Sequence, residues 1–308
     1  MLKKVLCIGE LLIDLVSTDG ETYIRKPGGA PANVAVAISK LGGKSFFLGQ
    51  VGNDNFGKYL KSVLIDNNVN TTYMKEEGQT TLALVTLDKN GERSFDFYRG
   101  SDENYNLEVN ELDINDECII HFGSAIAFLD KNNTENYYKL LKKGREKGAL
   151  ISFDPNYRET LITNDLIESY KENCWNFIKE ADFIKLSDEE AMLLTGKDSL
   201  EEAVLLLKSL NLNCVAITLG KEGTMVIQNS NSTIVESIKI KQKDSTGAGD
   251  AFVGGVLYKL SIYSENIDYI DVVGFANVVG AITCEEYGAI PSIPTIEKVN
   301  MRIKSSKN

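Results

Sequence analysis

Small residues and an aspartate stand together in the segment DSTGAGDAF, residues 244–252 of this 308-residue chain. We expect a helix to begin there, because the amphipathic segment Ala248–Leu260 overlaps its end. The N–H groups of Gly247, Ala248 and Gly249 would then lie unobstructed at a helix N-terminus, where partial positive charge favours an anion such as a phosphoryl group. Asp250, in the first turn, could take the proton from an attacking hydroxyl, or it could simply complement the helix dipole.

A second glycine-rich segment, GGAPAN, precedes the expected helix Ala32–Leu41. Its plainest interpretation is a turn and a helix start, with the proline at the first helical position. The segment also suits sugar binding, because Gly28 and Gly29 let backbone approach a ligand ring and Asn33 can both donate and accept hydrogen bonds. Asp14 could accept hydrogen bonds from two sugar hydroxyls, or it could be a solvated strand residue.

One of the six arginines follows a predicted strand directly. Arg158 ends the segment DPNYR after the apolar run Leu150–Asp154, at the edge of a parallel sheet where α/β proteins bind ligands. Its guanidinium could hold a sugar or the transferred phosphoryl group through two hydrogen bonds, or it could lie free on the surface. Farther along, Ser187 and Glu190 have the spacing of a capping box, which predicts a helix start.

Short apolar runs and longer amphipathic segments alternate along the chain and must position these residues. The alternation predicts βαβ units and a mainly parallel sheet covered by helices on both faces. The expected strands are Val5–Gly9, Phe46–Val51, Cys118–Phe122, Leu150–Asp154, Asp182–Leu186 and Val215–Leu219. The expected helices are Ala32–Leu41, Gly57–Asn67, Asn133–Lys147, Leu166–Glu180, Asp188–Leu194, Leu200–Leu210, Ala248–Leu260 and Tyr269–Tyr287.

Two regions break the alternation and predict a small β subdomain built from about residues 11–26 and 72–100. The first has extended character with no helix inside it. In the second, Thr80–Asp88 and Arg93–Arg99 flank Asn90-Gly91, a pair that favours a tight hairpin turn. A sheet inserted in this way would suit a reaction that must exclude water.

The composition excludes several classes of function. Lys and Arg number 33 against 44 Asp and Glu, a formal net charge of −11, which disfavours nucleic acids and anionic membranes as partners. The same charge means that a phosphorylated substrate would need local positive potential. Five scattered cysteines favour buried thiols in a reducing compartment over disulfides. With no apolar run of ~18 residues and no signal-like start, we expect a cytoplasmic protein and no membrane span.

Three other features of the sequence do not indicate a site. The segment GNDNFGKY, residues 52–59, nearly matches a P-loop but ends in Tyr59, which cannot supply the Ser or Thr hydroxyl that binds magnesium. The lone histidine, His121, lies in the apolar run CIIHF and is expected to be a core or strand-end residue. No GxGxxG follows the first predicted strand, so a dinucleotide fingerprint is absent.

The segment DSTGAGDAF resembles the C-terminal signature of the ribokinase-like carbohydrate kinases. GGAPANVA at 28–35, followed by GQVGNDNFG at 49–57, resembles that family's N-terminal signature, about 200 residues away. Shorter segments are similar to the fructokinase branch, namely GELLID at 9–14, DPNYR at 154–158, LSDEE at 186–190, FAN at 275–277 and GAIP at 288–291. The resemblance therefore runs nearly from end to end.

This resemblance implies a three-layer α/β/α body with a mainly parallel central sheet and a small inserted β-sheet lid, forming one kinase domain over 1–308. It implies ATP and Mg²⁺ as cofactors, with Asp250 as the catalytic base and the 247–249 N–H groups as the anion hole. The expected activity is phosphorylation of fructose to fructose 6-phosphate. The alternatives are a 2-keto-3-deoxygluconate kinase, a ribokinase, a nucleoside kinase, or a non-catalytic sugar-binding protein that kept the fold.

The resemblance also implies further site residues. Glu190 would join the magnesium–phosphate water network, with Ser187 standing where asparagine is frequent in the family, and Arg99 would contact the sugar unless it is a surface residue. The expected nucleotide contacts are Thr218, Gly220, Gly223, Ala276, Asn277 and the weaker candidate Lys185. Carbonyls around Asp244, Thr246, Thr283 and Gly288 could hold a monovalent cation such as K⁺. The exposed face of the lid could pair with a second subunit to form a homodimer.

Overall fold

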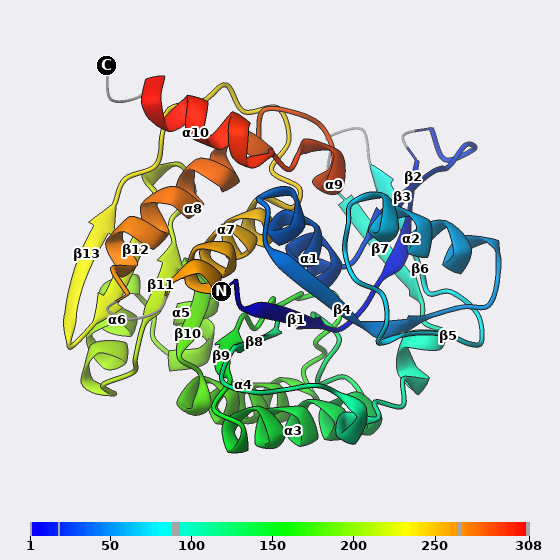
Figure 1. Ribbon diagram of the computed structural model, residues 1–308, viewed down its shortest axis with the longest axis horizontal. Coiled ribbons are helices and arrows are strands. Elements are labelled where there is room, and N and C mark those ends of the chain that lie inside the picture. Colours follow the sequence, from blue (N-terminus) through cyan, green and yellow to red (C-terminus); the bar gives the residue numbers. More distant parts are fainter. Residues whose placement is uncertain (1, 18, 88–92, 264–266, 306–308) are drawn as a thin grey trace.

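A large, mostly parallel sheet forms the centre of the molecule (Figure 1). The computed structural model describes residues 2–17, 19–87, 93–263 and 267–305, and within them the strand order is β13-β12-β11-β10-β9-β8-β1-β4-β5. Seven of these strands run parallel to one another: β1 (Lys4–Ile8), β4 (Lys44–Val51), β5 (Met74–Glu76), β8 (Cys118–Phe122), β9 (Leu150–Phe153), β10 (Phe183–Ser187) and β11 (Val215–Thr218). Two antiparallel strands, β12 (Thr224–Gln228) and β13 (Asn231–Val235), complete one edge.

Helices cover both faces of this sheet, as the alternating pattern predicts (Figure 1). Successive residues of β1 enter opposite cores, Val5 and Cys7 on one face and Leu6 and Ile8 on the other. The first face packs on α1 (Ala30–Lys40), α2 (Asn55–Asp66), α7 (Ala248–Ile262), α8 (Tyr269–Thr283) and α10 (Ile296–Ser305). The second packs on α3 (Lys131–Glu146), α4 (Ile167–Glu180), α5 (Asp188–Thr195) and α6 (Leu200–Ser209). The predicted three-layer α/β/α architecture is thus confirmed.

Three details of the helices differ from the sequence prediction. α1 begins at Ala30, so Pro31 is its second residue and not its first. α8 ends at Thr283 rather than Tyr287, because the carbonyl of Cys284 accepts the N–H groups of Lys243 and Asp244 and the chain turns away there. The short helix α9 (Ala289–Ser292) and the C-terminal α10 were not predicted. No helix in the described part of the chain is long and apolar enough to cross a membrane.

A separate small sheet has the order β3 (Ile24–Gly28), β2 (Leu12–Ser17), β6 (Leu82–Leu87), β7 (Arg93–Tyr98). β6 and β7 pair antiparallel as the hairpin pattern predicts, and the Asn90-Gly91 turn lies outside the described residues. β5, although within the range 72–100, pairs with β4 and belongs to the large sheet. The division of the chain into one domain with an inserted lid stays a prediction.

Asp54 ties the small sheet to the body. Its carboxylate accepts the N–H of Gly57 at 2.8 Å and so caps α2, which explains why this P-loop-like segment is a helix start. The same carboxylate accepts both the N–H (2.8 Å) and the hydroxyl (2.7 Å) of Thr80, just before β6. The entry to β6 is therefore held against the N-terminus of α2.

Candidate active site

Two helix N-termini meet at the carboxyl edge of the large sheet. α1 and α7 run side by side in the same direction, because Asn33 faces Asp250 and, one turn later, Ala37 lies against Gly254. A side chain at position 254 would place a Cβ 2.3 Å from that of Ala37, so glycine permits this close packing. The first residues of both helices, singled out by the two glycine-rich motifs, are thus brought together.

The N-terminus of α7 is open to a ligand. Its N-cap, Gly247, has φ 76° and no side chain to cap the helix, and a Cβ there would lie 2.5 Å from that of Ala289. Gly249 is exposed, with no atom within 4 Å of where its Cβ would be. The N–H of Ala248 donates to the carbonyl of Ser245 at 3.1 Å, while no acceptor in the described part of the chain meets the N–H of Gly249. These features suit an anion bound to backbone N–H groups.

Asp250 is held by Asn33 across the two helices. The Asn33 side-chain amide donates to Asp250 Oδ2 at 2.8 Å. Asn33 is only 6% exposed, and its Oδ1 is buried with no hydrogen-bond partner among the described residues. Burial raises the pKa of Asp250, and the Asn33 hydrogen bond and the charges of Arg158 and Lys185 oppose that rise. The arrangement keeps a carboxylate oriented and ready to accept a proton, with an unsatisfied acceptor beside it.

Asp14, Gly28 and Gly29 lie on the segment that leads into α1 and so precede Asn33 in the sequence. Asp14 is on β2, half-buried, and a Cβ on Gly28 of the neighbouring strand would lie 2.4 Å from Asp14 Oδ2. Gly29, with φ 112°, would meet the carbonyl oxygen of Glu10 at 2.4 Å if it carried a Cβ. Both glycines are therefore required for the chain to pass between Asp14 and Glu10 on its way into α1.

A buried triad of charged residues, Asp154, Lys185 and Glu190, lies at the ends of β9 and β10. Lys185 Nζ is 3.3 Å from Asp154 Oδ2 and 3.4 Å from Glu190 Oε2. Burial lowers the pKa of Lys185, but the two carboxylates more than reverse this, so the pKa lies above its ordinary value and the residue stays charged. Burial, with the charges of Glu190 and Asp250, raises the pKa of Asp154 to about 7 against the opposing charge of Lys185. The triad thus gives the site a fixed cation whose charge influences Asp250.

Glu190 also positions the loop that carries Arg158. Its carboxylate accepts the N–H of Ser187 at 2.6 Å, while Ser187 Oγ accepts the N–H of Glu190, so the predicted capping box is confirmed. The other carboxylate oxygen accepts the N–H of Tyr157 at 2.8 Å. Arg158, the next residue, is exposed, and its guanidinium donates to the carbonyl of Tyr157 at 2.9 Å. Among the described residues it forms no ion pair, so its charge remains available to a ligand.

The predicted nucleotide contacts Thr218, Gly220 and Gly223 differ in how open they are to a ligand. Thr218 is half-buried and donates to the carbonyl of Leu186 at 3.3 Å, and Gly220 is exposed with open space around it. Gly223 instead forms a tight turn, where a Cβ would lie 2.2 Å from the carbonyl oxygen of Val235. Their roles in nucleotide binding stay predictions.

Ala276 and Asn277, on α8, are buried. Ala276 packs against Gly255 of α7. The Asn277 side chain accepts the hydroxyl of Thr224 at 2.7 Å and donates to the carbonyl of Val235 at 2.8 Å. These contacts join α8 to β12 and β13, and the predicted contact with adenine stays a prediction.

The predicted cation-binding carbonyls lie where two loops meet. Asp244 accepts the N–H (3.0 Å) and hydroxyl (2.6 Å) of Thr246 on one oxygen and the N–H of Gly288 (2.9 Å) on the other. The carbonyl of Gly288 accepts the hydroxyl of Ser292, and the hydroxyl of Thr283 donates to Val279 within α8. The loop that begins α7 is therefore fixed to the start of α9, and a monovalent cation there stays a prediction.

Arg99 is paired with carboxylates at the end of β7. Its guanidinium binds Asp102 Oδ2 through Nε (2.8 Å) and Nη2 (2.6 Å), and Nη2 also lies 3.0 Å from Asp130. Its side chain is only 15% exposed. Asp130 caps α3, so these contacts fasten the end of the small sheet to α3. Nothing in the sequence pattern indicated this anchoring role, and the predicted sugar contact stays a prediction.

His121 is a core residue, as its apolar neighbours predict. It is 1% exposed, and its Nδ1 lies 3.1 Å from Ser152 Oγ. Burial, with the nearby charge of Lys185, lowers the pKa of His121 to about 3, so the ring is neutral. It takes no part in the site.

Comparisons with known proteins match this chain to carbohydrate kinases over nearly its whole length. The model of a family described as pfkB family carbohydrate kinase matches residues 2–296. A probable fructokinase-6 of Arabidopsis thaliana, described as chloroplastic, is 39% identical over 314 residues, covering 96% of this chain and 81% of that protein. Among solved structures, Vibrio cholerae O395 fructokinase with fructose, ADP and calcium is 31% identical with a TM-score of 0.87, covering 97% of this chain and 98% of the other. Xylella fastidiosa fructokinase with bound ATP is 28% identical with a TM-score of 0.89 over 100% of both chains.

Proposed function

The chain belongs to the pfkB family of carbohydrate kinases, and on that premise we propose that it transfers the γ-phosphoryl group of ATP to a hydroxyl of fructose, giving fructose 6-phosphate. The observation that carries the proposed chemistry is the Asn33–Asp250 pair beside the open N-terminus of α7. The choice of fructose is supported by the similarity to fructokinases of plants and bacteria over nearly the whole chain.

In the proposed complex the sugar lies over the start of α1. Asp14 would accept hydrogen bonds from sugar hydroxyls, and the buried Oδ1 of Asn33 would accept another. Gly28 and Gly29 leave the backbone accessible in between. A ligand hydroxyl on Asn33 Oδ1 would satisfy an acceptor that no described residue pairs with.

Asp250 would act as the general base. Its carboxylate takes the proton of the attacking hydroxyl, whose oxygen forms the new bond to the γ-phosphorus. The bond between that phosphorus and the bridging oxygen breaks, and ADP leaves with the bond's electron pair. Because Asn33 fixes one oxygen of Asp250, the other oxygen is free to face the hydroxyl.

The transferred group carries negative charge that the protein must stabilise. The N–H groups from Gly247 to Gly249 and the guanidinium of Arg158 are the groups we assign to this task. Bound Mg²⁺ would add Lewis-acid stabilisation of the phosphoryl oxygens. Because Glu190 already accepts from Tyr157, Ser187 and Lys185, we expect it to reach the ion only through water, with phosphate oxygens as the main ligands.

ATP would lie along the carboxyl ends of β10 and β11. The open space at Gly220 and the half-buried hydroxyl of Thr218 support this placement. We propose that the small sheet is a lid that closes over the sugar and excludes water. A homodimer through the exposed face of that sheet, activation by K⁺ and a cytoplasmic location are parts of the same proposal.

A coupled ADP-release screen tests this assignment. Purified protein with ATP and Mg²⁺ is offered fructose, ribose, 2-keto-3-deoxygluconate, tagatose and adenosine in turn. We expect fructose to give the highest kcat/KM, and mass spectrometry of the product to show the 6-phosphate. Activity with another acceptor but not fructose would overturn the substrate and leave the kinase. No turnover with any acceptor would instead favour a non-catalytic sugar-binding protein.

A further inference from the structure

Glu10 is a buried carboxylate to which the proposed chemistry gives no task. It lies two residues after the end of β1 and is only 3% exposed. A carboxylate in such a position costs free energy unless hydrogen bonds compensate it. Burial raises the pKa of Glu10, and contacts with Ser124 and Ala30 and the charge of Arg158 oppose that rise. Because burying this carboxylate costs free energy, we expect Glu10 to have a structural or functional role near the site.

The carboxylate joins two segments that are far apart in the sequence. One oxygen accepts the N–H of Ala30 at 3.2 Å, and the other accepts the hydroxyl of Ser124. Ala30 is the first residue of α1, so its N–H has no acceptor within the helix. The N-cap residue, Gly29, has no side chain to serve as that acceptor. Glu10 therefore caps α1 from a different loop.

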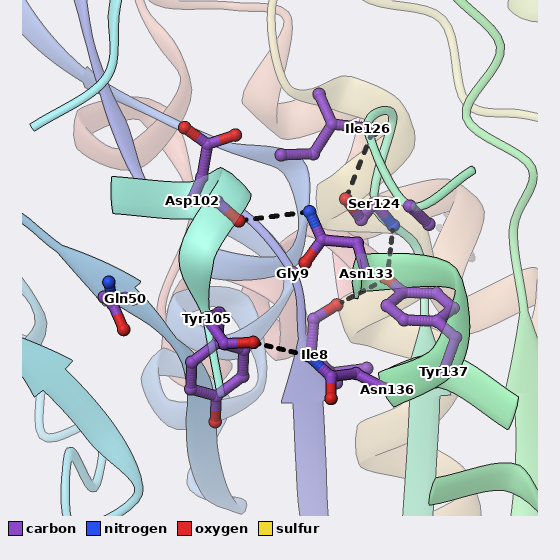
Figure 2. Close-up of a pocket in the computed structure, with 11 residues that line it drawn as sticks. Ile8, Gly9, Gln50, Asp102, Tyr105, Ser124, Ile126, Asn133, Asn136 and Tyr137 are labelled. Atoms are coloured by element: carbon purple, nitrogen blue, oxygen red, sulfur yellow. Dashed lines mark hydrogen bonds between the residues drawn. The ribbon is translucent and has the colours of Figure 1, made fainter. Parts of the chain in front are cut away.

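Close packing leaves this corner little freedom. A Cβ on Gly9 would lie 2.5 Å from that of Ser124 and 2.6 Å from Cγ of Pro31. Ser124 is itself held by two hydrogen bonds, which Figure 2 shows. Its N–H donates to the hydroxyl of Tyr137 (3.2 Å), and its Oγ accepts the N–H of Ile126 (3.2 Å). The cavity beside it measures only about 10 Å³, about enough for one water.

We infer that Glu10 is a positioning residue, which fixes the start of α1 so that Asn33 faces Asp250. Asn33 lies one helical turn after Ala30, its N–H donates to the carbonyl of Gly29 at 3.0 Å, and its amide holds Asp250 at 2.8 Å. A shift of the first turn would therefore move both the sugar-binding backbone and the partner of the base. The expected kinetic effects rest on the proposed function.

Substitutions separate the hydrogen bonds from the charge. Glu10→Ala leaves the Ala30 N–H without an acceptor, and we expect kcat to fall and the sugar KM to rise, with kcat/KM lower by a factor of about 10 to 100. The ATP KM should stay within about twofold, because the ATP residues lie on other elements. Glu10→Gln keeps an acceptor for Ala30 and offers an N–H to Ser124, so it should restore kcat/KM to within about threefold of the wild type. Ser124→Ala, which removes one hydrogen bond, should lie in between.

Hydrogen exchange provides a readout that does not depend on the substrate. In Glu10→Ala the amides of Ala30, Ala32 and Asn33, which are the exchangeable ones in residues 30–33, should exchange at least about tenfold faster than in the wild type. Ser261→Ala is the control for a buried hydroxyl lost elsewhere, since Ser261 is fully buried and donates to Tyr258 at the far end of α7. It should leave exchange at 30–33 and the sugar KM unchanged.

Each result bears on the inference. Unchanged exchange at 30–33 and an unchanged sugar KM in Glu10→Ala would overturn it. Glu10→Gln as impaired as Glu10→Ala would also overturn it, because charge rather than hydrogen-bond geometry would then matter. If Glu10→Ala does not fold, Ser124→Ala decides by the same two measurements. A wild-type enzyme inactive on every sugar would refute the proposed function, while the exchange experiment would still test the positioning.

Discussion

Replacing Asn33 by alanine removes the one side-chain hydrogen bond to Asp250 that the described structure contains. The Asn33 amide lies 2.8 Å from Asp250 Oδ2, and its side chain is 6% exposed, so water does not readily replace it. A hydrogen bond to a charged group contributes about 1.5–3 kcal/mol. If the bond is needed to orient the base, its loss corresponds to a fall in kcat/KM of about 10- to 100-fold.

The substitution should also change the pH dependence, and the sign follows from the hydrogen bond. The Asn33 amide stabilises the ionised carboxylate, so its removal raises the pKa of Asp250 further above the ordinary value that burial already raises. A general base works only when ionised. The acidic limb of kcat/KM should therefore move to higher pH, and the loss of activity should be larger at low pH than at high pH.

A pH series of kcat/KM for fructose, measured by ADP release, checks both expectations. Asn173→Ala is a matched control, because the half-buried Asn173 on α4 also forms side-chain hydrogen bonds, donating to the carbonyl of Ser169 (2.8 Å) and accepting the hydroxyl of Tyr138 (2.8 Å). Its pH profile should match the wild type. An acidic limb that stays in place or moves to lower pH in Asn33→Ala would refute the role of Asn33 as the partner of the base.

Substitutions at three further residues test other parts of the structure. Arg99→Met should lower the free energy of unfolding in urea by about 3 kcal/mol, because it leaves the buried Asp102 without its cation; a loss below about 0.5 kcal/mol would contradict the anchoring role. Arg158→Met should lower kcat about 10- to 100-fold with little change in the sugar KM, and Arg158→Lys should recover part of it; equal kcat in Arg158→Met and the wild type would remove Arg158 from the reaction. His121→Gln should reduce acid sensitivity, because the folded-state pKa of about 3 lies below the unfolded value of about 6.5 and the wild type loses stability as pH falls below about 6.5. At about pH 5 that loss is about 2 kcal/mol, and equal pH slopes in urea titrations of the two proteins would contradict it.

The body of the fold could be predicted from the sequence because its strands are buried on both faces. All six predicted strands are present within a residue or two of their expected bounds. The hairpin of β12 and β13 is harder to predict from the sequence. Its turn is formed by Asn229 and Ser230, both with positive φ (51° and 60°), and not by the Asn-Gly pair that marks such turns most clearly. The helix α10 buries fully only Val299, which leaves a weak apolar pattern.

The location of the candidate site could also be predicted, because each glycine-rich motif marks a helix start. The contacts that join these motifs in space are tertiary contacts between segments far apart in the sequence. The pairing of Lys185 with Asp154 and Glu190 depends on β9 and β10 being neighbours, which no local pattern contains. The contact of Glu10 with Ala30 and Ser124 likewise depends on three loops meeting at one sheet edge. For Arg99 the family resemblance implies a sugar contact, which stays a prediction, while its pairing with Asp102 and Asp130 is another tertiary contact that no local pattern contains.

The most direct test of the central claim is the turnover of Asp250→Asn with ATP and fructose, measured together with the binding of each ligand by calorimetry. The substitution keeps the shape of the side chain and a hydrogen-bonding partner for Asn33 but removes the base. We predict that kcat falls at least about 10³-fold while the Kd of fructose and of ATP change less than about fivefold. Turnover within about tenfold of the wild type would contradict the assignment of Asp250 as the base.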